Sequence, residues 1–150
     1  MTITINKKID NSNNEIKLEL VKRSDCNFLY TLLKQRNPKA NISHKILPTF
    51  KEHVRFVLSR PYSKWYIIKI QNKKLGSIYL SRQNEIGIFL HKKYQKSGFG
   101  GKALHILMKK NKKNRYLANI SPKNYESINF FKKNGFKLIQ YTYELIPLKT

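Results

Sequence analysis

The sequence predicts a mixed α/β domain: a mostly antiparallel sheet with one parallel, splayed strand pair, flanked by helices. Two observations lead to this expectation. Short apolar runs separated by turn residues follow one another over residues 65–90, which is typical of an antiparallel meander. A strand–helix–strand unit over residues 85–120 then requires a parallel pair with a right-handed crossover. The 150 residues have the length of one ordinary domain, so we expect a single domain over residues 1–150.

The first half of the chain supplies a strand and two helices. Apolar and polar residues alternate over residues 16–20, the pattern of a half-buried strand. Ser24 or Asp25 can cap a following helix, which the Asn-Pro pair at residues 37–38 ends. The Thr-x-x-Glu spacing at residues 49–52 predicts a capping box, in which each side chain binds a backbone N–H of the other residue, and so begins a second helix.

The second half completes the sheet and adds two more helices. Gly135 stands where a helix ends in the left-handed conformation. The expected elements are strands at 65–71, 75–81 and 85–90, a helix around Leu104, a strand at 115–120, a helix at 124–134 and one or two strands at 136–145.

The composition is strongly basic. The chain has 31 Lys and Arg against 8 Asp and Glu, which gives a formal net charge of +23. Such an excess can bind nucleic acid, because each neutralised phosphate releases counterions. Lys is spread over every segment, however, and accompanies many Asn and Ile, as drift toward A/T-rich codons would produce. A nucleic-acid partner therefore stays open but is not favoured, whereas anionic small molecules should be steered to this surface.

The cysteine and apolar content exclude several classes of protein. The single cysteine, Cys26, rules out an internal disulfide and a cysteine-based zinc cluster. His91 and His105 have no partner at metal-ligand spacing, so we expect no metal. The longest apolar stretches fall short of the roughly 18 residues that span a bilayer, and the N-terminus lacks the features of a secretory signal. We expect a cytoplasmic protein without membrane contact.

A Gly-rich turn at residues 95–102 follows the strand that ends near Leu90 and opens the third helix. Glycines let the backbone approach a ligand, and the free N–H groups and positive dipole of the helix attract negative charge, so a phosphate or pyrophosphate fits best. Two nucleotide motifs are excluded by spacing. Lys102 precedes Ala103 rather than the Ser or Thr of a Walker loop, and residues 115–120 lack the acid of a dinucleotide-binding fold.

Two motifs resemble the GNAT superfamily of N-acyltransferases. The pyrophosphate loop of that family, Gln/Arg-x-x-Gly-x-Gly/Ala, is matched at Gln95, Gly98 and Gly100. Its penultimate helix, Asn-x-x-Ala/Ser-Ile-x-Leu/Phe-Tyr/Phe-x-x-x-Gly-Phe, is matched over residues 124–136. Phe131 stands where many relatives carry a Tyr that protonates the departing thiolate. The resemblance implies a GNAT-like acyl-CoA N-acyltransferase fold and acetyl-CoA as the acetyl donor.

The resemblance also implies where acetyl-CoA would bind. The pyrophosphate would lie on loop N–H groups, with the Ser97 hydroxyl as a further donor, and the pantetheine arm would run beside the strand that ends at residue 90. The residues implied for the cofactor are Phe89, Leu90, Gln95, Lys96, Ser97, Gly98, Phe99, Gly100, Gly101, Lys102, Asn124 and Phe131.

Three side chains are candidates for the proton transfers of acetylation. Glu85, the one acid on the central strands, is the candidate general base, directly or through water; a surface carboxylate that balances a nearby cation is the equal alternative. Asn119 stands where ribosomal-protein alanine acetyltransferases place a Glu base, and its amide could bind a water or the substrate. Tyr141 is a candidate acid in place of the usual Tyr, with Tyr125 and Tyr143 as alternatives.

The acceptor side is expected to include Arg36, His53 and Trp65. The segments around Arg36 and His53 are similar to acetyltransferases of nucleotide-linked amino sugars, such as the one in pseudaminic acid synthesis. The resemblance therefore implies direct acetyl transfer from acetyl-CoA to a primary amine, on a nucleotide-linked amino sugar or another small amine. A protein amine, ribosomal or N-terminal, and a non-catalytic module that binds coenzyme A or nucleic acid are the alternatives. A homodimer stays open.

Overall fold

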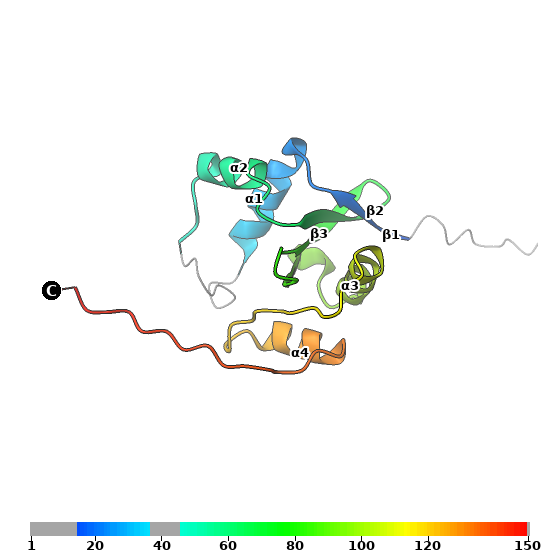
Figure 1. Cartoon of the computed structure of the whole chain (residues 1–150). Helices are drawn as coiled ribbons and strands as arrows, with labels where there is room; N and C mark the ends of the chain where they lie inside the picture. The colour runs from blue at the N-terminus through cyan, green and yellow to red at the C-terminus, as the bar shows by residue number, and fades with distance from the viewer. Residues whose placement is uncertain (1–14, 37–45, 150) are drawn as a thin grey trace, which may run out of the picture.

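The computed structural model describes residues 15–36 and 46–149. Its core is a 4-stranded antiparallel sheet in the order β1-β2-β3-β4. Helices α1 and α2 lie on one face of the sheet and α3 on the other, with α4 beyond α3 (Figure 1). The strands are β1 (Ile16–Leu20), β2 (Lys64–Ile70), β3 (Lys73–Leu80) and β4 (Ile86–Leu90), and the helices are α1 (Cys26–Gln35), α2 (Phe50–Leu58), α3 (Phe99–Lys110) and α4 (Tyr125–Lys133).

Two apolar clusters hold the layers together, one on each face of the sheet. On the α3 face, Leu104 and Leu107 are completely buried against Ile78 and Leu80 of β3. On the opposite face, α1 and α2 pack over Ile67 of β2. Because both faces are covered, the central strands read as nearly continuous apolar runs, as a doubly covered sheet requires.

The predicted helix signals are confirmed at α2 and α4. The Thr49 side chain accepts a hydrogen bond from the Glu52 N–H at 3.2 Å, and Glu52 returns the bond to the Thr49 N–H, which completes the capping box. Gly135 follows α4 with φ +90°, a left-handed conformation that costs glycine little.

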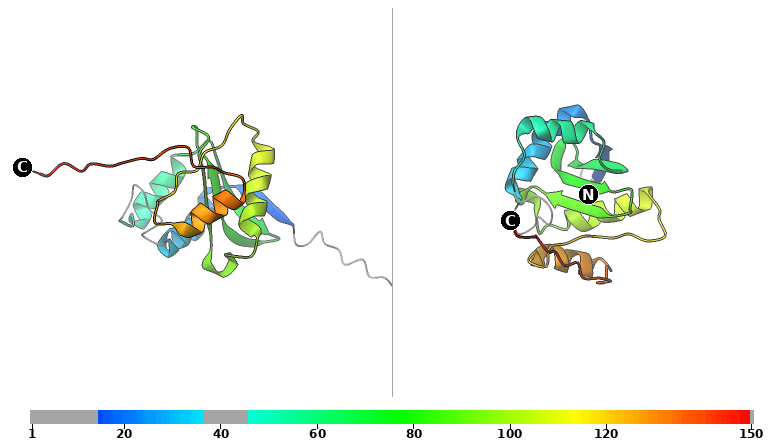
Figure 2. Two further views of the ribbon diagram at one scale, coloured as in Figure 1. Left: turned by 90° about the horizontal axis from the view of Figure 1, so that it is seen from below. Right: turned by 60° about the vertical axis from the view of Figure 1, so that its left-hand side comes forward.

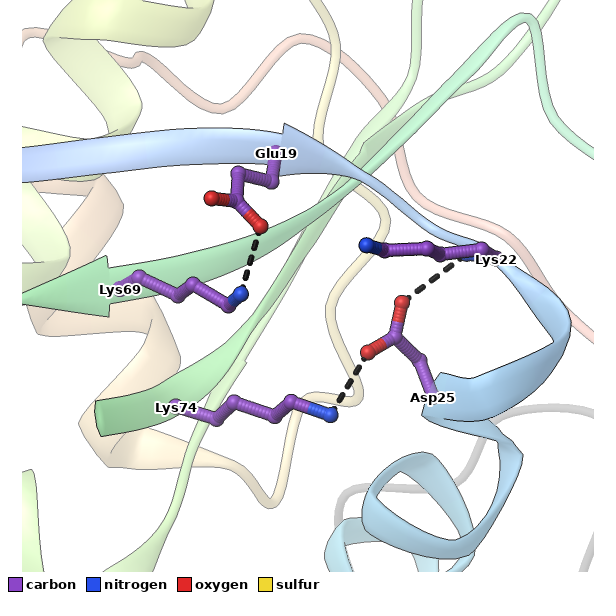
Figure 3. A network of polar contacts seen from close by, with 5 residues as sticks. All are labelled: Glu19, Lys22, Asp25, Lys69 and Lys74. Atoms are coloured by element: carbon purple, nitrogen blue, oxygen red, sulfur yellow. Dashed lines mark hydrogen bonds and ion pairs between the residues drawn. The ribbon is translucent and has the colours of Figure 1, made fainter. Parts of the chain in front are cut away.

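A buried ion pair joins the start of α1 to the sheet (Figure 3). The Asp25 carboxylate is 2% exposed, accepts a bond from the Lys22 N–H at 2.9 Å and pairs with Lys74 of β3 at 2.8 Å. Glu19 and Lys69 form a second pair at 2.5 Å between β1 and β2. Asp25 therefore caps the short turn Arg23–Asp25 and ties it to β3, rather than binding an N–H of α1.

The predicted parallel strand pair does not form a ladder, because residues 115–120 are not a strand. In the described residues, a single parallel bridge joins Leu117 to Glu85, with the Ile86 N–H donating to the Leu117 carbonyl at 2.7 Å. The Tyr116 hydroxyl is held by the end of α3, at 2.8 Å from the Asn111 carbonyl. Apart from the bridge at Leu117, residues 115–120 pair with none of the described strands.

The prediction of strands at residues 136–145 is also wrong. Phe136 packs against Phe131 with ring centroids 5.0 Å apart, and the chain beyond it is extended and leaves the body of the domain (Figures 1 and 2). Tyr141 and Tyr143 there are 76% and 90% exposed. A strand needs a partner edge, and the irregular path of residues 115–120 offers no ladder that this segment could extend.

Candidate active site

A row of three residues crosses the sheet on the face covered by α1 and α2. Trp65 of β2 pairs with Tyr79 of β3, and Tyr79 pairs with Gly87 of β4. A Cβ at position 87 would lie 2.2 Å from the Tyr79 ring, so glycine is what allows this ring to lie across β4.

Tyr79 is held in place by an aromatic cluster, which consists of Phe56, Tyr62, Trp65 and Tyr79. The Tyr62 and Tyr79 rings are stacked with centroids 3.8 Å apart and an interplanar angle of 3°. Trp65 meets Tyr62 edge to face at 5.0 Å, and its buried indole N–H has no hydrogen-bond partner among the residues that the structure describes. These contacts hold Tyr62, which in turn stacks on the Tyr79 ring.

The loop that carries Tyr62 is anchored by the turn between β3 and β4. The Arg82 guanidinium donates to the carbonyls of Pro61 at 3.0 Å and Arg60 at 3.1 Å. Arg60 itself has φ +50°, a conformation that a residue with a side chain rarely adopts. Arg82 therefore stabilises an otherwise unfavourable backbone and fixes the place of Tyr62.

Both tyrosine hydroxyls stay protonated at neutral pH. Burial is the main cause that raises the pKa of Tyr62, and the neighbouring Tyr79 adds to the rise. Burial also raises the pKa of Tyr79, where the charge of Glu85 adds to the rise and Arg36 and the hydrogen bond with Tyr62 oppose it. Arg36 thus acts through its charge on both hydroxyls, and Glu85 acts on that of Tyr79.

Glu85 stands directly before β4, in phase with Gly87 and Phe89, so alternation turns it toward the α1 and α2 face. Its carboxylate accepts a bond from the Ser81 hydroxyl at 3.4 Å, and its N–H donates to the same oxygen at 3.0 Å. The turn thus fixes the position of the carboxylate, whose charge adds to the rise that burial causes in the pKa of Tyr79.

Of the residues predicted for the acceptor side, Arg36 and Trp65 join this group and His53 lies apart. His53 is buried between α1 and α2, where its Nε2 is 3.2 Å from the Cys26 carbonyl and its ring packs on Tyr30. Burial lowers the pKa of His53, although the bond to Cys26 opposes this. The ring therefore acts as a neutral contact between the two helices.

Asn119 and Tyr141, two of the predicted catalytic residues, are exposed and make no hydrogen bond that the structure records among the described residues. Tyr62 and Tyr79 were not predicted at all. The sequence did hold one signal for them, since Gly87 in the middle of an apolar strand indicates a close approach by another group.

The Gly-rich loop continues from β4. The Gln95 side chain donates to the Leu90 carbonyl at 2.9 Å and ties the loop to the end of the strand. Lys96 and Gly98 have φ +59° and +82°, and these left-handed residues turn the chain into α3. The Ser97 hydroxyl donates to the Tyr94 carbonyl at 2.5 Å, so its proton is already used within the loop.

The start of α3 is open toward solvent. Gly98 is its N-cap, has no capping side chain, and a Cβ there would meet nothing within 4 Å. The first N–H groups of the helix therefore lack side-chain partners from the cap. Gly100 and Gly101 face α4 instead, where a Cβ would lie 3.1 Å from Phe130 and 3.4 Å from Asn134.

The remaining residues predicted for the cofactor differ in exposure. Lys96 and Lys102 are exposed cations, and Lys96 lies 4.0 Å from Glu126. The Asn124 side-chain oxygen accepts from the Ser127 N–H at 3.1 Å, which leaves its amide N–H₂ group to bind elsewhere. Phe131 is 5% exposed and packs in the core.

An anion fits this loop by its chemistry, because unpaired N–H groups, a positive helix dipole and nearby lysines converge at the start of α3. Across residues 15–36 and 46–149 the side chains include no group of three His, Cys, Asp or Glu that could hold a metal. No helix in the same residues is long and apolar enough to cross a membrane.

Residues 26–136 match the Acetyltransferase (GNAT) family, so the chain belongs to this family and is an acetyltransferase. A domain from Methanocaldococcus jannaschii has a similar structure, with a TM-score of 0.75 and 25% identity over 87% of this chain and 94% of that chain. No curated protein matches the sequence.

Two further structures share the fold and bind coenzyme A. The spermidine N-acetyltransferase from Vibrio cholerae, in complex with CoA and spermine, has a TM-score of 0.73 and 16% identity over 93% of this chain and 89% of that chain. RimL, a ribosomal L7/L12 alpha-N-protein acetyltransferase in complex with coenzyme A, has a TM-score of 0.69 and 20% identity over 83% of this chain and 81% of that chain.

Proposed function

We propose that this protein transfers an acetyl group directly from acetyl-CoA to a primary amine of a small molecule. The observation that carries the proposal is the position of Glu85. This carboxylate acts through its charge on the protonated hydroxyl of Tyr79 and stands directly before β4, the strand that leads into the Gly-rich loop. Family membership supports acetyl-CoA as the donor.

The coenzyme is proposed to bind at the loop and along β4. The N–H groups from Lys96 to Gly101 would hold the pyrophosphate, and Lys102 would add positive charge. The pantetheine arm would follow β4 back from Leu90 as an added strand does. Gly87 stands three residues before Leu90, and strands rise about 3.3 Å per residue, so the two are about 10 Å apart.

Glu85 is proposed as the general base. Most amines arrive as ammonium ions, so the amine must lose a proton before its nitrogen can attack the thioester carbonyl. Glu85 would take that proton, and Asn119 could bind the intervening water. Backbone N–H groups near Phe89 and Leu90 would stabilise the oxyanion, because hydrogen bonds placed in advance cost no reorganisation during the reaction.

The acceptor is proposed to be an amine that also carries negative charge, such as a nucleotide-linked amino sugar. Arg36 acts on both tyrosine hydroxyls and stands at the end of α1, where it can attract a phosphate. A polyamine such as spermidine brings several positive charges, and the charge of Arg36, which acts on both tyrosine hydroxyls, would oppose its binding.

Two variants test these roles by thiol release from acetyl-CoA. Glu85→Gln should lower kcat by about 10²- to 10⁴-fold, the usual contribution of a general base, whereas Glu144→Gln in the exposed C-terminal segment should not. Arg36→Gln should lower kcat/KM for an amino-sugar nucleotide more than for the free amino sugar. A wild-type protein that released no thiol with any small amine would contradict the proposed function.

A protein amine is the second candidate, because RimL shares the fold. Acetylation of ribosomal proteins or N-terminal peptides, without activity on small amines, would favour it.

We further propose a cytoplasmic enzyme, which can form a homodimer through the apolar side chains of the C-terminal segment. Leu145 and Leu148 there are 87% and 95% exposed, and sedimentation of the full chain tests this association.

A further inference from the structure

Acetyl transfer needs a proton for the thiolate that leaves, and the tyrosine that many relatives use for this purpose is replaced here by Phe131. The tyrosines of the C-terminal half are poor substitutes. Tyr125, Tyr141 and Tyr143 are 72%, 76% and 90% exposed, so water would orient their hydroxyls as readily as any neighbouring group. Tyr79 differs from them, because it is half-buried and its ring is fixed.

We propose that Tyr79 is the general acid of the reaction and that its hydroxyl protonates the departing sulfur of coenzyme A. This inference rests on the proposed function. The ring lies across Gly87 on β4, on the face where Glu85 stands and beside the strand along which the thioester would lie. The proposed acid, Tyr79, and the proposed base, Glu85, thus lie on the same face of the sheet near Gly87.

The surroundings of Tyr79 hold its ring in one orientation and keep its hydroxyl protonated until the thiolate forms. The Tyr62 ring is stacked on Tyr79 with centroids 3.8 Å apart and an interplanar angle of 3°. Burial raises the pKa of Tyr79, the charge of Arg36 opposes the rise and the charge of Glu85 adds to it, so the proton is present when the reaction begins.

The step balances without another reactant. Glu85 first takes the ammonium proton and passes it to solvent, which leaves a neutral amine. The amine nitrogen then forms a bond to the carbonyl carbon, and Glu85 takes the second proton from that nitrogen. The carbon–sulfur bond then breaks with its electron pair on sulfur, and the sulfur takes the proton of Tyr79. The Tyr79 phenolate regains a proton through solvent, to which Glu85 returns the one it took. The products are the N-acetylated amine and free coenzyme A.

Tyr79→Phe is the direct test, because it removes the hydroxyl and keeps the ring that stacks on Tyr62 and covers Gly87. We expect kcat with acetyl-CoA to fall about 10²- to 10⁴-fold while KM for both substrates changes little. Tyr62→Phe should give a smaller fall, since it keeps the ring that stacks on Tyr79 and removes only a neighbouring hydroxyl. Tyr143→Phe, on a 90% exposed side chain, is the matched control and should be unchanged.

A second donor separates an acid from a merely structural residue. An acetyl thioester of a nitro-substituted aryl thiol needs no acid, because its thiolate is stable at neutral pH. With this donor, Tyr79→Phe should regain a rate within about threefold of the wild type. Equal losses with both donors would overturn the assignment, as would a Tyr79→Phe enzyme that is fully active with acetyl-CoA. If the wild type itself is inactive with every amine, the proposed function fails first.

Discussion

Replacing Gly87 by alanine should lower both kcat and the stability of the fold. The new Cβ would lie 2.2 Å from the Cε1 and Cζ atoms of Tyr79 and 2.4 Å from its hydroxyl oxygen, whereas ordinary contacts begin at 3.4 Å. The ring must therefore move by more than an ångström. Its end is the free part of a side chain, so Tyr79 can swing away while β3 and β4 stay paired.

The losses of stability and of kcat follow from the contacts that the displaced Tyr79 ring gives up. Breaking the stack with Tyr62 removes about 0.5–1.5 kcal/mol, and strain in the crowded contact adds about 1–3 kcal/mol. For a domain of this length, each kcal/mol lowers Tm by about 2–4 °C. A hydroxyl displaced by about 1 Å can cost about 10²-fold in rate, so kcat of Gly87→Ala should fall by at least that factor.

The assay compares kcat and Tm of Gly87→Ala with those of Gly135→Ala. Gly135 has φ +90° and open space around it, so alanine there should cost about 1 kcal/mol of stability and leave kcat unchanged. The reasoning is refuted if Gly87→Ala retains at least half the wild-type kcat, or if its crystal structure shows the Tyr79 ring still stacked on Tyr62.

Two further predictions concern stability. Asp25→Asn should lower the free energy of unfolding in urea by about 2–4 kcal/mol, because Lys74 loses the partner of a largely buried ion pair; a change below about 0.5 kcal/mol would contradict this. His53 should make the fold less stable as pH falls below 6.5. Folding lowers the pKa of His53, mainly by burial, so the unfolded chain binds the proton more readily than the folded chain. The stability that neutral His53 provides above pH 6.5 is therefore lost as the pH falls. In denaturation at pH 7 and 5, His53→Gln should flatten this dependence and His105→Gln, on an exposed side chain, should preserve it.

The elements that could be predicted from the sequence are those with local signals. The capping box at Thr49 and the left-handed Gly135 each depend on a few neighbouring residues, and both were predicted correctly. The β2–β3–β4 meander follows from short turns that leave adjacent strands few alternatives. By contrast, the period-two pattern of residues 136–145 indicates a strand face but not a partner edge, and the structure pairs this segment with none of the described strands.

The candidate site could be predicted only in part for a similar reason. Glu85 could be predicted from the sequence because acids are rare in this chain and one on a central strand stands out. Tyr79 and Tyr62 come from separate elements, and their contact depends on Arg82 holding the loop before β2. No local pattern records that contact. The missing side chain at Gly87 was the one clue.

The distribution of the few acids explains why Glu85 is suited to accept a proton. Glu19 and Asp25 are neutralised by lysines within the sheet layers, and Glu52 is used in the cap of α2. Glu85 differs because its recorded side-chain partner is the neutral hydroxyl of Ser81, which orients the carboxylate without cancelling its charge. In a protein of net charge +23, an anionic acceptor would be drawn to the surface as a whole, while its ammonium group would find an oriented carboxylate at the aromatic cluster. The same charge pattern that attracts the acceptor would therefore also turn its amine toward the base.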